Sequence, residues 1–512
     1  MLVMRGSFAD LSVVHKVCEH SDLKSPRGNY MSHAIRNPFN PSDSRVEVFD
    51  DGHAVLKDGT KLSPASQNPW YVLATIAGEE KNALIFNTTS PEIRKANRRL
   101  WNAWMCQPLS AEGRSKLAKD MNFEQSDLAP ITDDERHLII EKFRVSFPDV
   151  VSPEESLIPN PHELVDFSET FFPNVLNISG FVFLGGISFK SCAFCFHLEC
   201  NKIVCLGNAN FSNSVTNGPI SCRFSRFAKK SIFTSSTFDQ SYFDGTAFSE
   251  YVHFDDCLFG SEASFKKTVF SSGVSFEKSF FLDHAMFDFT DFQNIAWFDG
   301  VTFKGYTSFM GACFSGPTVF RNSHFLKFVP VFAQSKTHAD TRFSDIYDLW
   351  PEPSREDAEE GKQAYMSLRQ IAAKNNNVDL EHFFLRQEMR CKEKSADNFS
   401  DKLIFSIYGY LSDFGISTSR PLIGLVIVVL SGWHLIGWHL KTKFESAHPG
   451  MESLAISIGN TIPFLGINAR FEPDLYKDAP LWLSWLSSFQ TIAGITLLFF
   501  LGLGLRNRFR LK

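Results

Sequence analysis

Few side chains in this sequence combine the residue types and the spacing that chemistry requires. Cys192 and Cys195 form a Cys-x-x-Cys pair, which is the spacing of a redox or zinc motif. His434 and His439 lie five residues apart, so on a helix they do not share a face and do not converge on a metal ion. No phosphate-loop or dinucleotide fingerprint follows the turns DDGH and KDGT, which are more typical of hairpins. We therefore predict no catalytic residue, cofactor or bound metal, and any enzymatic activity would have to reside in the N-terminal domain.

Length and composition bound the class of protein. At 512 residues the chain exceeds what one hydrophobic core serves, so we expect about two to four structural units. The hydrophobic share of 44% fits a soluble body with a small membrane part. The net charge of −6, with both signs plentiful, does not favour nucleic acid as a partner. The N-terminus has no signal-peptide pattern, which places the ten cysteines in a reducing compartment.

Phenylalanine is the residue that this sequence repeats, with 53 copies against ten tyrosines and nine tryptophans. In the middle of the chain the phenylalanines alternate spacings of five and six residues. The uninterrupted run comprises Phe254, Phe259, Phe265, Phe270, Phe276, Phe281, Phe287, Phe292, Phe298, Phe303, Phe309, Phe314, Phe320 and Phe325. Two residues before almost every one stands a small or β-branched residue, such as Cys257, Thr268 or Ser279. We predict that these phenylalanines form the core of a repeat structure.

A period near 5.5 residues fits neither an α-helix nor a strand alternation, and its persistence is the signature of a solenoid. A coil with four short faces would take one large and one small interior side chain per face. Roughly seven coils of about twenty-two residues, stacked about 4.8 Å apart, would then make a rod about 35 Å long. Cys192, Cys200, Cys205, Cys222 and Cys257 occupy interior positions of this pattern, which favours packing as their role.

The repeat resembles the pentapeptide-repeat proteins, in the variant whose central residue is Phe and whose units alternate five and six residues. Segments such as SYFDGTAFSEYVHFDDCLFG carry the resemblance, which covers about 167–332. It implies a right-handed, four-sided β-helix. Pro173, Gly185, Gly186 and the segment SVTNGPIS interrupt the pattern, so we expect bulges or a small insertion there.

Two segments are long and apolar enough to cross a membrane. Residues 421–440 and 481–505 contain no Asp, Glu, Lys or Arg, and each can span about 30 Å of hydrocarbon as a helix. Arg506, Arg508, Arg510 and Lys512 follow the second segment. By the positive-inside rule both termini are expected in the cytoplasm of a bacterium, with the connecting loop on the outer side of the inner membrane. A stripe of small and polar residues on the second span would suit packing on another helix: Ser484, Ser487, Ser488, Thr491 and Gly494.

Between the spans, residues 451–467 are apolar but too short to cross, so they are expected to re-enter the membrane or lie on its surface. The order of span, short helix and span is also that of two-helix channels with a pore loop. The turn containing Asn460, Thr461 and Pro463 would be that loop, but NTIPFLG lacks the carbonyl ladder of a potassium filter. We therefore favour an anchoring role for the hairpin and keep the pore as an alternative.

The remaining segments complete the predicted domain organisation. Residues 1–40 are predicted to be disordered, and 41–164 to form a small α+β domain that caps one end of the solenoid at 165–334. Residues 335–419 are expected to form a helical hairpin and an amphipathic juxtamembrane helix, and 420–512 the membrane hairpin. The helices and spans after 335 resemble a C-terminal module found in many bacterial pentapeptide-repeat membrane proteins.

Three function classes fit these features. The first is a membrane-anchored scaffold whose solenoid binds a protein partner or a second copy of the chain, with membrane lipid around its hairpin. The second is a channel-like protein with the solenoid as a cytoplasmic sensor. The third is a DNA-mimicking protein that protects a topoisomerase, which requires a strongly acidic rod. Residues 167–334 carry thirteen acidic and twelve basic side chains, so we rank this class last and expect no nucleic acid as partner.

Overall fold

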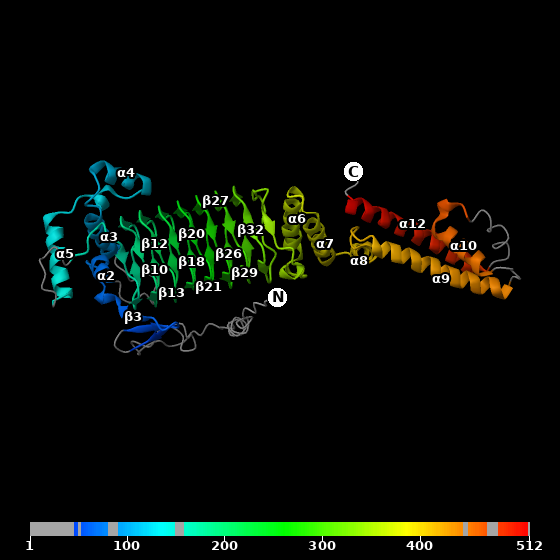
Figure 1. Cartoon of the computed structure of the whole chain (residues 1–512), viewed down its shortest axis with the longest axis horizontal. Helices are drawn as coiled ribbons and strands as arrows, with labels where there is room; N and C mark the ends of the chain where they lie inside the picture. The colour runs from blue at the N-terminus through cyan, green and yellow to red at the C-terminus, as the bar shows by residue number, and fades with distance from the viewer. Residues whose placement is uncertain are drawn as a thin grey trace, which may run out of the picture.

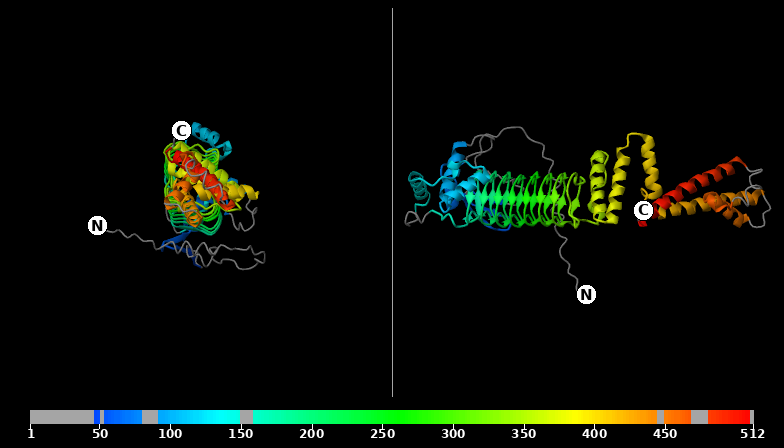
Figure 2. Two further views of the ribbon diagram at one scale, coloured as in Figure 1. Left: turned by 90° about the vertical axis from the view of Figure 1, so that its right-hand side faces the viewer. Right: turned by 90° about the horizontal axis from the view of Figure 1, so that it is seen from above.

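The computed structural model describes residues 46–49, 53–79, 91–148, 158–443, 449–467 and 480–509. The region predicted as disordered, 1–40, lies outside them. The described elements follow one another along a single long axis, from N-terminal helices through a β-solenoid and a helical pair to the apolar hairpin (Figure 1). Seen along that axis, the coils of the solenoid superpose (Figure 2, left).

The solenoid has about eight turns and four faces, each a parallel sheet. This confirms the predicted four-sided β-solenoid. The turns exceed the expected seven because the coil begins at Val165 and closes at Phe343. Following the chain through one coil, we number the faces 1 to 4.

Face 1 contains β4 (Val165–Asp166), β8 (Ile187–Ser188), β12 (Ala209–Asn210), β16 (Ser231–Ile232), β20 (Val252–His253), β24 (Val274–Ser275), β28 (Ala296–Trp297), β32 (Thr318–Phe320) and β34 (Arg342–Phe343). Face 2 contains β5 (Thr170–Phe172), β9 (Ala193–Phe194), β13 (Val215–Thr216), β17 (Thr237–Phe238), β21 (Leu258–Phe259), β25 (Phe280–Phe281), β29 (Thr302–Phe303) and β33 (His324–Phe325). Face 3 contains β6 (Leu176–Asn177), β10 (Leu198–Glu199), β14 (Ile220–Ser221), β18 (Ser241–Tyr242), β22 (Ala263–Ser264), β26 (Ala285–Met286) and β30 (Thr307–Ser308). Face 4 contains β7 (Val182–Phe183), β11 (Val204–Cys205), β15 (Arg226–Phe227), β19 (Ala247–Phe248), β23 (Val269–Phe270), β27 (Asp291–Phe292) and β31 (Cys313–Phe314).

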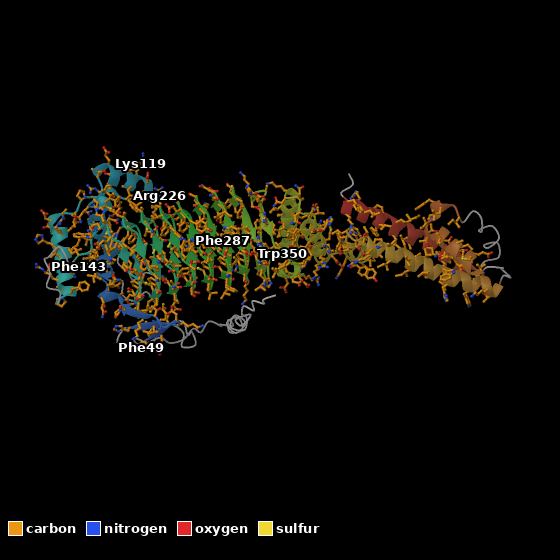
Figure 3. All side chains as sticks on the ribbon, in the orientation of Figure 1. Phe49, Lys119, Phe143, Arg226, Phe287 and Trp350 are labelled. Carbon is orange, nitrogen blue, oxygen red and sulfur yellow. The ribbon has the colours of Figure 1, made fainter. Side chains whose placement is uncertain are left out.

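The interior is built from stacked phenylalanine rings. All fourteen phenylalanines of the run from Phe254 to Phe325 are at most 3% exposed. Phe287, labelled in Figure 3, shows the arrangement: its ring is stacked between Phe265 at 5.1 Å and Phe309 at 4.9 Å. It also meets Phe276 edge-on, at 5.5 Å and 85°. Stacked and edge-to-face rings are both favourable aromatic geometries, so each coil reinforces its neighbours.

The alternation of five and six residues follows from two kinds of corner. After faces 1 and 3 the chain turns through a residue of positive φ, such as Lys278 (φ 57°) after face 1 and Lys267 (φ 57°) after face 3. The next residue is often Ser, Thr or Cys, and its side chain donates to a carbonyl of the previous coil. Thr268 bonds Phe243 at 2.7 Å, and Cys257 bonds Phe233 at 2.9 Å. The small interior residues therefore tie successive coils together, in addition to leaving space.

The expected irregularity at SVTNGPIS is wrong. Val215, in that segment, pairs with Ala193 below and Thr237 above, each 22 residues away. The weak pattern arose because Thr216 replaces a Phe in the interior without changing the length of the coil. The true irregularity is a missing residue one coil later, where Ile220 pairs with Ser241, only 21 residues on.

The N-terminal region covers one end of the solenoid, at the left of Figure 1. It comprises β1 (Val46–Val48), β2 (Ala54–Leu56), β3 (Lys61–Pro64), η1 (Ala65–Gln67), α2 (Pro69–Ala74), α3 (Pro91–Met105), α4 (Ala111–Met121), η2 (Gln125–Leu128) and α5 (Asp133–Ser146). Asn102 of α3 donates to Gly180 O at 2.9 Å and accepts from Val182 N at 3.0 Å. This side chain thus replaces a neighbouring strand at the exposed end of face 4.

The opposite end is covered by η4 (Tyr347–Leu349), α6 (Ala358–Lys374) and α7 (Val378–Ser395). Trp350, labelled in Figure 3, lies 5.2 Å from Phe325 and 4.8 Å from Phe384 of α7, ring centre to ring centre. The aromatic core therefore continues from the last coil into the helical pair. The next helix, α8 (Phe399–Ser412), has the exposed apolar side chains Phe399, Leu403, Ile404, Ile407 and Tyr410.

The C-terminal hairpin consists of α9 (Ser419–Lys443) and α12 (Leu481–Phe509), with α10 (Pro449–Thr461) and η5 (Pro463–Leu465) between them. By length and composition α9 and α12 are able to cross a membrane, which agrees with the predicted spans. The short helix α10 lies beside both of them (Figures 1 and 2). It runs from the distal end of the hairpin, away from the solenoid, back toward the middle of α12.

Candidate functional sites

One corner of the solenoid carries exposed aromatic side chains. Phe224 and Phe289 stand at the corner between faces 3 and 4, are 59% and 51% exposed, and have φ values of 58° and 56°. Other coils place a lysine, Lys202 or Lys267, or a glycine at this corner. The left-handed conformation costs a bulky residue roughly 1–2 kcal/mol, and an exposed ring recovers little of that cost by burial. The two phenylalanines are therefore poorly explained by stability alone.

The two rings lie on the same edge, which we call the Phe224–Phe289 edge. Phe224 is three coils from Phe289, which places them about 14 Å apart at the usual strand spacing. Each ring covers a glycine of the next coil: a Cβ at Gly245 would come within 2.7 Å of Phe224, and one at Gly311 within 2.6 Å of Phe289. Each glycine leaves room for one face of the ring, and the other face of the ring is exposed. Spaced aromatic anchors beside charged residues such as Lys267 have the chemistry of a protein-binding surface.

The C-terminal hairpin has a polar core centred on Gln490 of α12, which is 1% exposed. Its amide nitrogen donates to Val428 O of α9 at 3.1 Å and to Ser457 Oγ of α10 at 2.9 Å. Its carbonyl accepts from Asn460 Nδ2 of α10 at 3.3 Å. Gln490 therefore joins all three helices, and its amide is satisfied without water. Such satisfaction is required of polar groups in hydrocarbon.

Two glycines permit this close packing. A Cβ at Gly432 of α9 would lie 1.9 Å from Gln490 Nε2, and a Cβ at Gly494 of α12 would lie 1.9 Å from Thr461 O. A side chain at Gly494 would require α10 to move, because it meets backbone atoms, whereas one at Gly432 would displace the side chains of Gln490 and Ser457. Within the hairpin, α10 is thus fixed between two long helices by small residues and side-chain hydrogen bonds.

The predicted packing stripe is only partly buried in the structure. Thr491 donates to Asn460 O at 3.0 Å, and Gly494 lies under Thr461, so both contact α10 of the same chain. Ser484 and Ser488 are exposed, and Ser487 is half-buried. Of the predicted turn residues, Asn460 and Thr461 are buried at the end of α10, and Pro463 begins η5. Sequence reasoning missed Gln490, although a Gln inside an apolar span is itself a signal.

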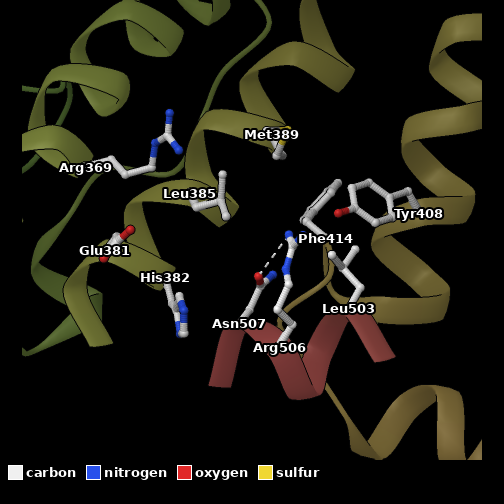
Figure 4. Close-up of a pocket in the computed structure, with 10 residues that line it drawn as sticks. All are labelled: Arg369, Glu381, His382, Leu385, Met389, Tyr408, Phe414, Leu503, Arg506 and Asn507. Atoms are coloured by element: carbon white, nitrogen blue, oxygen red, sulfur yellow. Dashed lines mark hydrogen bonds between the residues drawn. The ribbon is translucent and has the colours of Figure 1, made fainter. Parts of the chain in front are cut away.

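A cavity of about 450 Å³ lies where the hairpin meets the helical pair (Figure 4). We call it the junction cavity. Its apolar wall includes Leu385 and Met389 of α7, Phe414 of the α8–α9 turn and Leu503 of α12. Its polar rim comprises Arg369, Glu381, His382, Tyr408, Arg506 and Asn507. Arg506 and Asn507 project from the last turns of α12 toward α7 in Figure 4.

Two carboxylates near the cavity are each shared by two cations. Glu388, whose side chain is 3% exposed, meets Arg369 at 3.0 Å and Lys392 at 2.7 Å. A second carboxylate, Asp413, lies 3.3 Å from Arg386 and 3.9 Å from Arg420. With Glu381 of the rim included, these groups carry three negative and four positive charges, so the junction has a small excess of positive charge before Arg506 is counted.

The turn between α8 and α9 closes the cavity. Asp413, Phe414 and Gly415 have successive φ values of 51°, 55° and 78°. Phe414 is only 5% exposed, and its ring lies 5.7 Å from that of Tyr408. A buried aromatic in a left-handed turn is a strained arrangement, and the hydrogen bond from Asn507 Nδ2 to Gly415 O at 2.8 Å helps to hold it.

No family model, curated protein or solved structure matches this chain. Function therefore has to be argued from the geometry.

The residues first considered for chemistry do not assemble into a reactive site. Cys192 faces the interior and donates to Phe167 O at 2.9 Å, and burial raises the pKa of its thiol far above the ordinary range. Cys195 faces outward and is buried under the β1–β3 hairpin, with its thiol pKa also raised by burial. His434 is exposed and His439 is 6% exposed against Trp482. Among the described residues no group of three His, Cys, Asp or Glu side chains is arranged to hold a metal ion.

Proposed function

We propose that this protein is a non-enzymatic, membrane-anchored scaffold of the pentapeptide-repeat type, which holds a rigid solenoid at a membrane and binds a protein there. The observation that carries the proposal is the continuity of the chain's hydrophobic core with its membrane-proximal helices. Phe343 of the last coil meets Phe384 of α7 at 6.4 Å, and Arg386 of α7 pairs with Asp413 at the entry to α9. The solenoid is therefore joined to the hairpin through packed helices, which suits a rod held at a fixed position.

The hairpin is proposed to cross the inner membrane of a bacterium with both chain ends in the cytoplasm. The charge pattern supports this orientation, because Arg506 and Arg508 lie at the solenoid end of α12. At the distal end Trp438 and Trp482 lie 6.5 Å apart, as expected of an aromatic belt at the opposite interface.

The partner is proposed to bind along the Phe224–Phe289 edge. The rings are the largest exposed apolar groups on the coils, and they occupy strained positions for which Lys and Gly serve in other coils. Aromatic anchors that contribute little to folding are typical of interface hot spots. A partner that bridges both rings would contact at least four coils.

Affinity purification after cross-linking tests this proposal. The full chain is extracted in detergent, and the proteins recovered with it are compared with those recovered with Phe224→Asn/Phe289→Asn. Asn accepts a left-handed conformation, so the backbone should be retained. The matched control is Leu326→Asn, which removes an exposed apolar residue (47%) after face 2. We expect a protein that is lost with the double variant and kept with the control. Identical recovery from all three forms would contradict the proposed edge.

A second candidate function is an ion pore formed by several copies of the hairpin. The re-entrant position of α10 favours it, because its C-terminal end meets the middle of α12 at Gly494. Against it, the large exposed side chains after α10 are those of Phe464 and Leu465, at 74% and 52%, and these would not coordinate an ion. Planar-bilayer recording of the purified chain separates the two functions. Reproducible single-channel currents that vanish in Thr461→Val would support the pore.

A further inference from the structure

The junction cavity has the features of a site for an amphiphilic anion. Part of its wall is apolar, formed by side chains such as Leu385 and Leu503. Its rim holds the guanidinium groups of Arg369 and Arg506, which approach from the helical pair and from the hairpin, respectively (Figure 4). A ligand that satisfies both surfaces must combine a negative group with hydrocarbon.

Arg506 is the group best placed to bind the negative charge. Its guanidinium makes a long hydrogen bond, from Nη2 to Asn507 Oδ1 at 3.5 Å, and within the described chain no carboxylate forms an ion pair with it at 4.0 Å or less. Arg369 is held at the opposite side by Glu388, which also binds Lys392. The excess positive charge near the cavity attracts an anion, and an arginine fork suits a phosphate.

The position of the cavity identifies the source of that anion. The cavity lies at the solenoid end of α12, where the span would leave the hydrocarbon. Beside it, α8 exposes Ile404 (63%) and Tyr410 (81%), as a helix lying on a membrane surface does. A lipid in this leaflet would have its phosphate at the level of Arg506 and its acyl chains along α8 and Leu503.

We propose that the junction cavity binds one anionic glycerophospholipid, with Arg506 and Arg369 on the headgroup phosphate. The site differs from the general attraction of basic residues to anionic membranes because its charges converge on one cavity. The inference rests on the hairpin spanning a membrane and is independent of the protein partner.

The test is native mass spectrometry of the full chain in detergent, titrated with phosphatidylglycerol or phosphatidylcholine. We expect one phosphatidylglycerol to be retained preferentially. Arg506→Gln should weaken its binding about tenfold, because a charge-assisted contact is lost. Arg506→Lys should weaken it less. The matched control is Arg508→Gln, which makes the same charge change two residues away, outside the cavity lining, and should alter binding by less than about twofold.

Three results would overturn the proposal. Equal retention of phosphatidylcholine would remove the need for an anion. Equal loss in Arg506→Gln and Arg508→Gln would show general electrostatics instead of a site. Displacement of the lipid by millimolar inorganic phosphate would identify a free phosphate as the ligand. Sedimentation of each variant with the membrane fraction, measured separately, reports whether the hairpin inserts, so failure of the anchor is distinguishable from failure of the lipid site.

Discussion

Phe287 and Phe289 are separated by one residue, but substitution should affect the stability of the solenoid very differently at the two positions. Phe287 is fully buried between two stacked rings, whereas Phe289 is 51% exposed at a left-handed corner. We expect Phe287→Ala to destabilise the solenoid strongly. We expect Phe289→Asn to leave its stability nearly unchanged. Both changes remove one phenylalanine ring from the same coil, so a difference between the two variants reports interior packing and not the mere loss of a phenylalanine.

The magnitudes follow from the contacts. Removing a buried phenylalanine costs about 3–5 kcal/mol, and Phe287 has ring partners at 4.9, 5.1, 5.5 and 5.6 Å whose contacts would be lost. At about 2–4 °C per kcal/mol for a unit of this size, the unfolding midpoint should fall by roughly 6–20 °C. For Phe289→Asn, relief of the left-handed strain offsets the lost contact with Gly311, so the change should stay within about 1 kcal/mol.

Circular dichroism of the full chain in detergent, followed during heating, provides the assay. Solenoid coils interact mainly with their neighbours, so the strand signal should report a local loss of coils as well as global unfolding. Equal shifts for the two variants, or a larger shift for Phe289→Asn, would refute the assignment of Phe287 to the interior and Phe289 to the surface.

Three further predictions concern other parts of the chain. Gly494→Val should displace α10 and destabilise the hairpin by about 1–3 kcal/mol. The control Gly502→Val, at a position with open space around it, should not. The resistance of α10 to protease in detergent, measured for both variants, checks this. Burial and neighbouring carboxylates raise the pKa of Glu277, so the folded state disfavours its charged form. Glu277→Gln should therefore raise the thermal midpoint at neutral pH, and this gain should disappear as the pH falls through the raised pKa. A gain that grows in acid would contradict the prediction. An impermeant maleimide applied to intact cells should label Thr442→Cys and spare Phe509→Cys, and the reverse pattern would invert the proposed topology.

The period of the phenylalanines was sufficient to predict the solenoid, because only a four-sided coil places every fifth or sixth residue inside. The structure of its corners could not be predicted from the spacing. The role of Ser279 and its equivalents, which donate to a carbonyl of the previous coil, depends on backbone positions that spacing alone does not give. Likewise Thr216 looked like the start of an irregular segment, whereas a polar residue of suitable size simply fills one interior position.

The candidate sites depend on contacts between distant segments. Gln490 joins helices through residues 33 and 62 positions away, and the junction cavity combines Arg369 with Arg506. Hydropathy identifies the two long apolar helices but not where α10 packs against them, which depends on the space left by Gly432 and Gly494. The spacing already places Phe224 and Phe289 out of register with the interior positions, but it does not give the left-handed corner at which they stand.

Site-specific photo-cross-linking in intact membranes tests the scaffold function most directly. Lys267 and Lys278 are matched positions, both exposed and both at φ 57°, but they stand at opposite corners of the coil. A photoreactive side chain at 267, between Phe224 and Phe289 along the edge, should capture a protein partner in the membrane fraction, and the same side chain at 278 should not. Capture at 278 alone, or no capture at either position, would contradict a partner-binding edge.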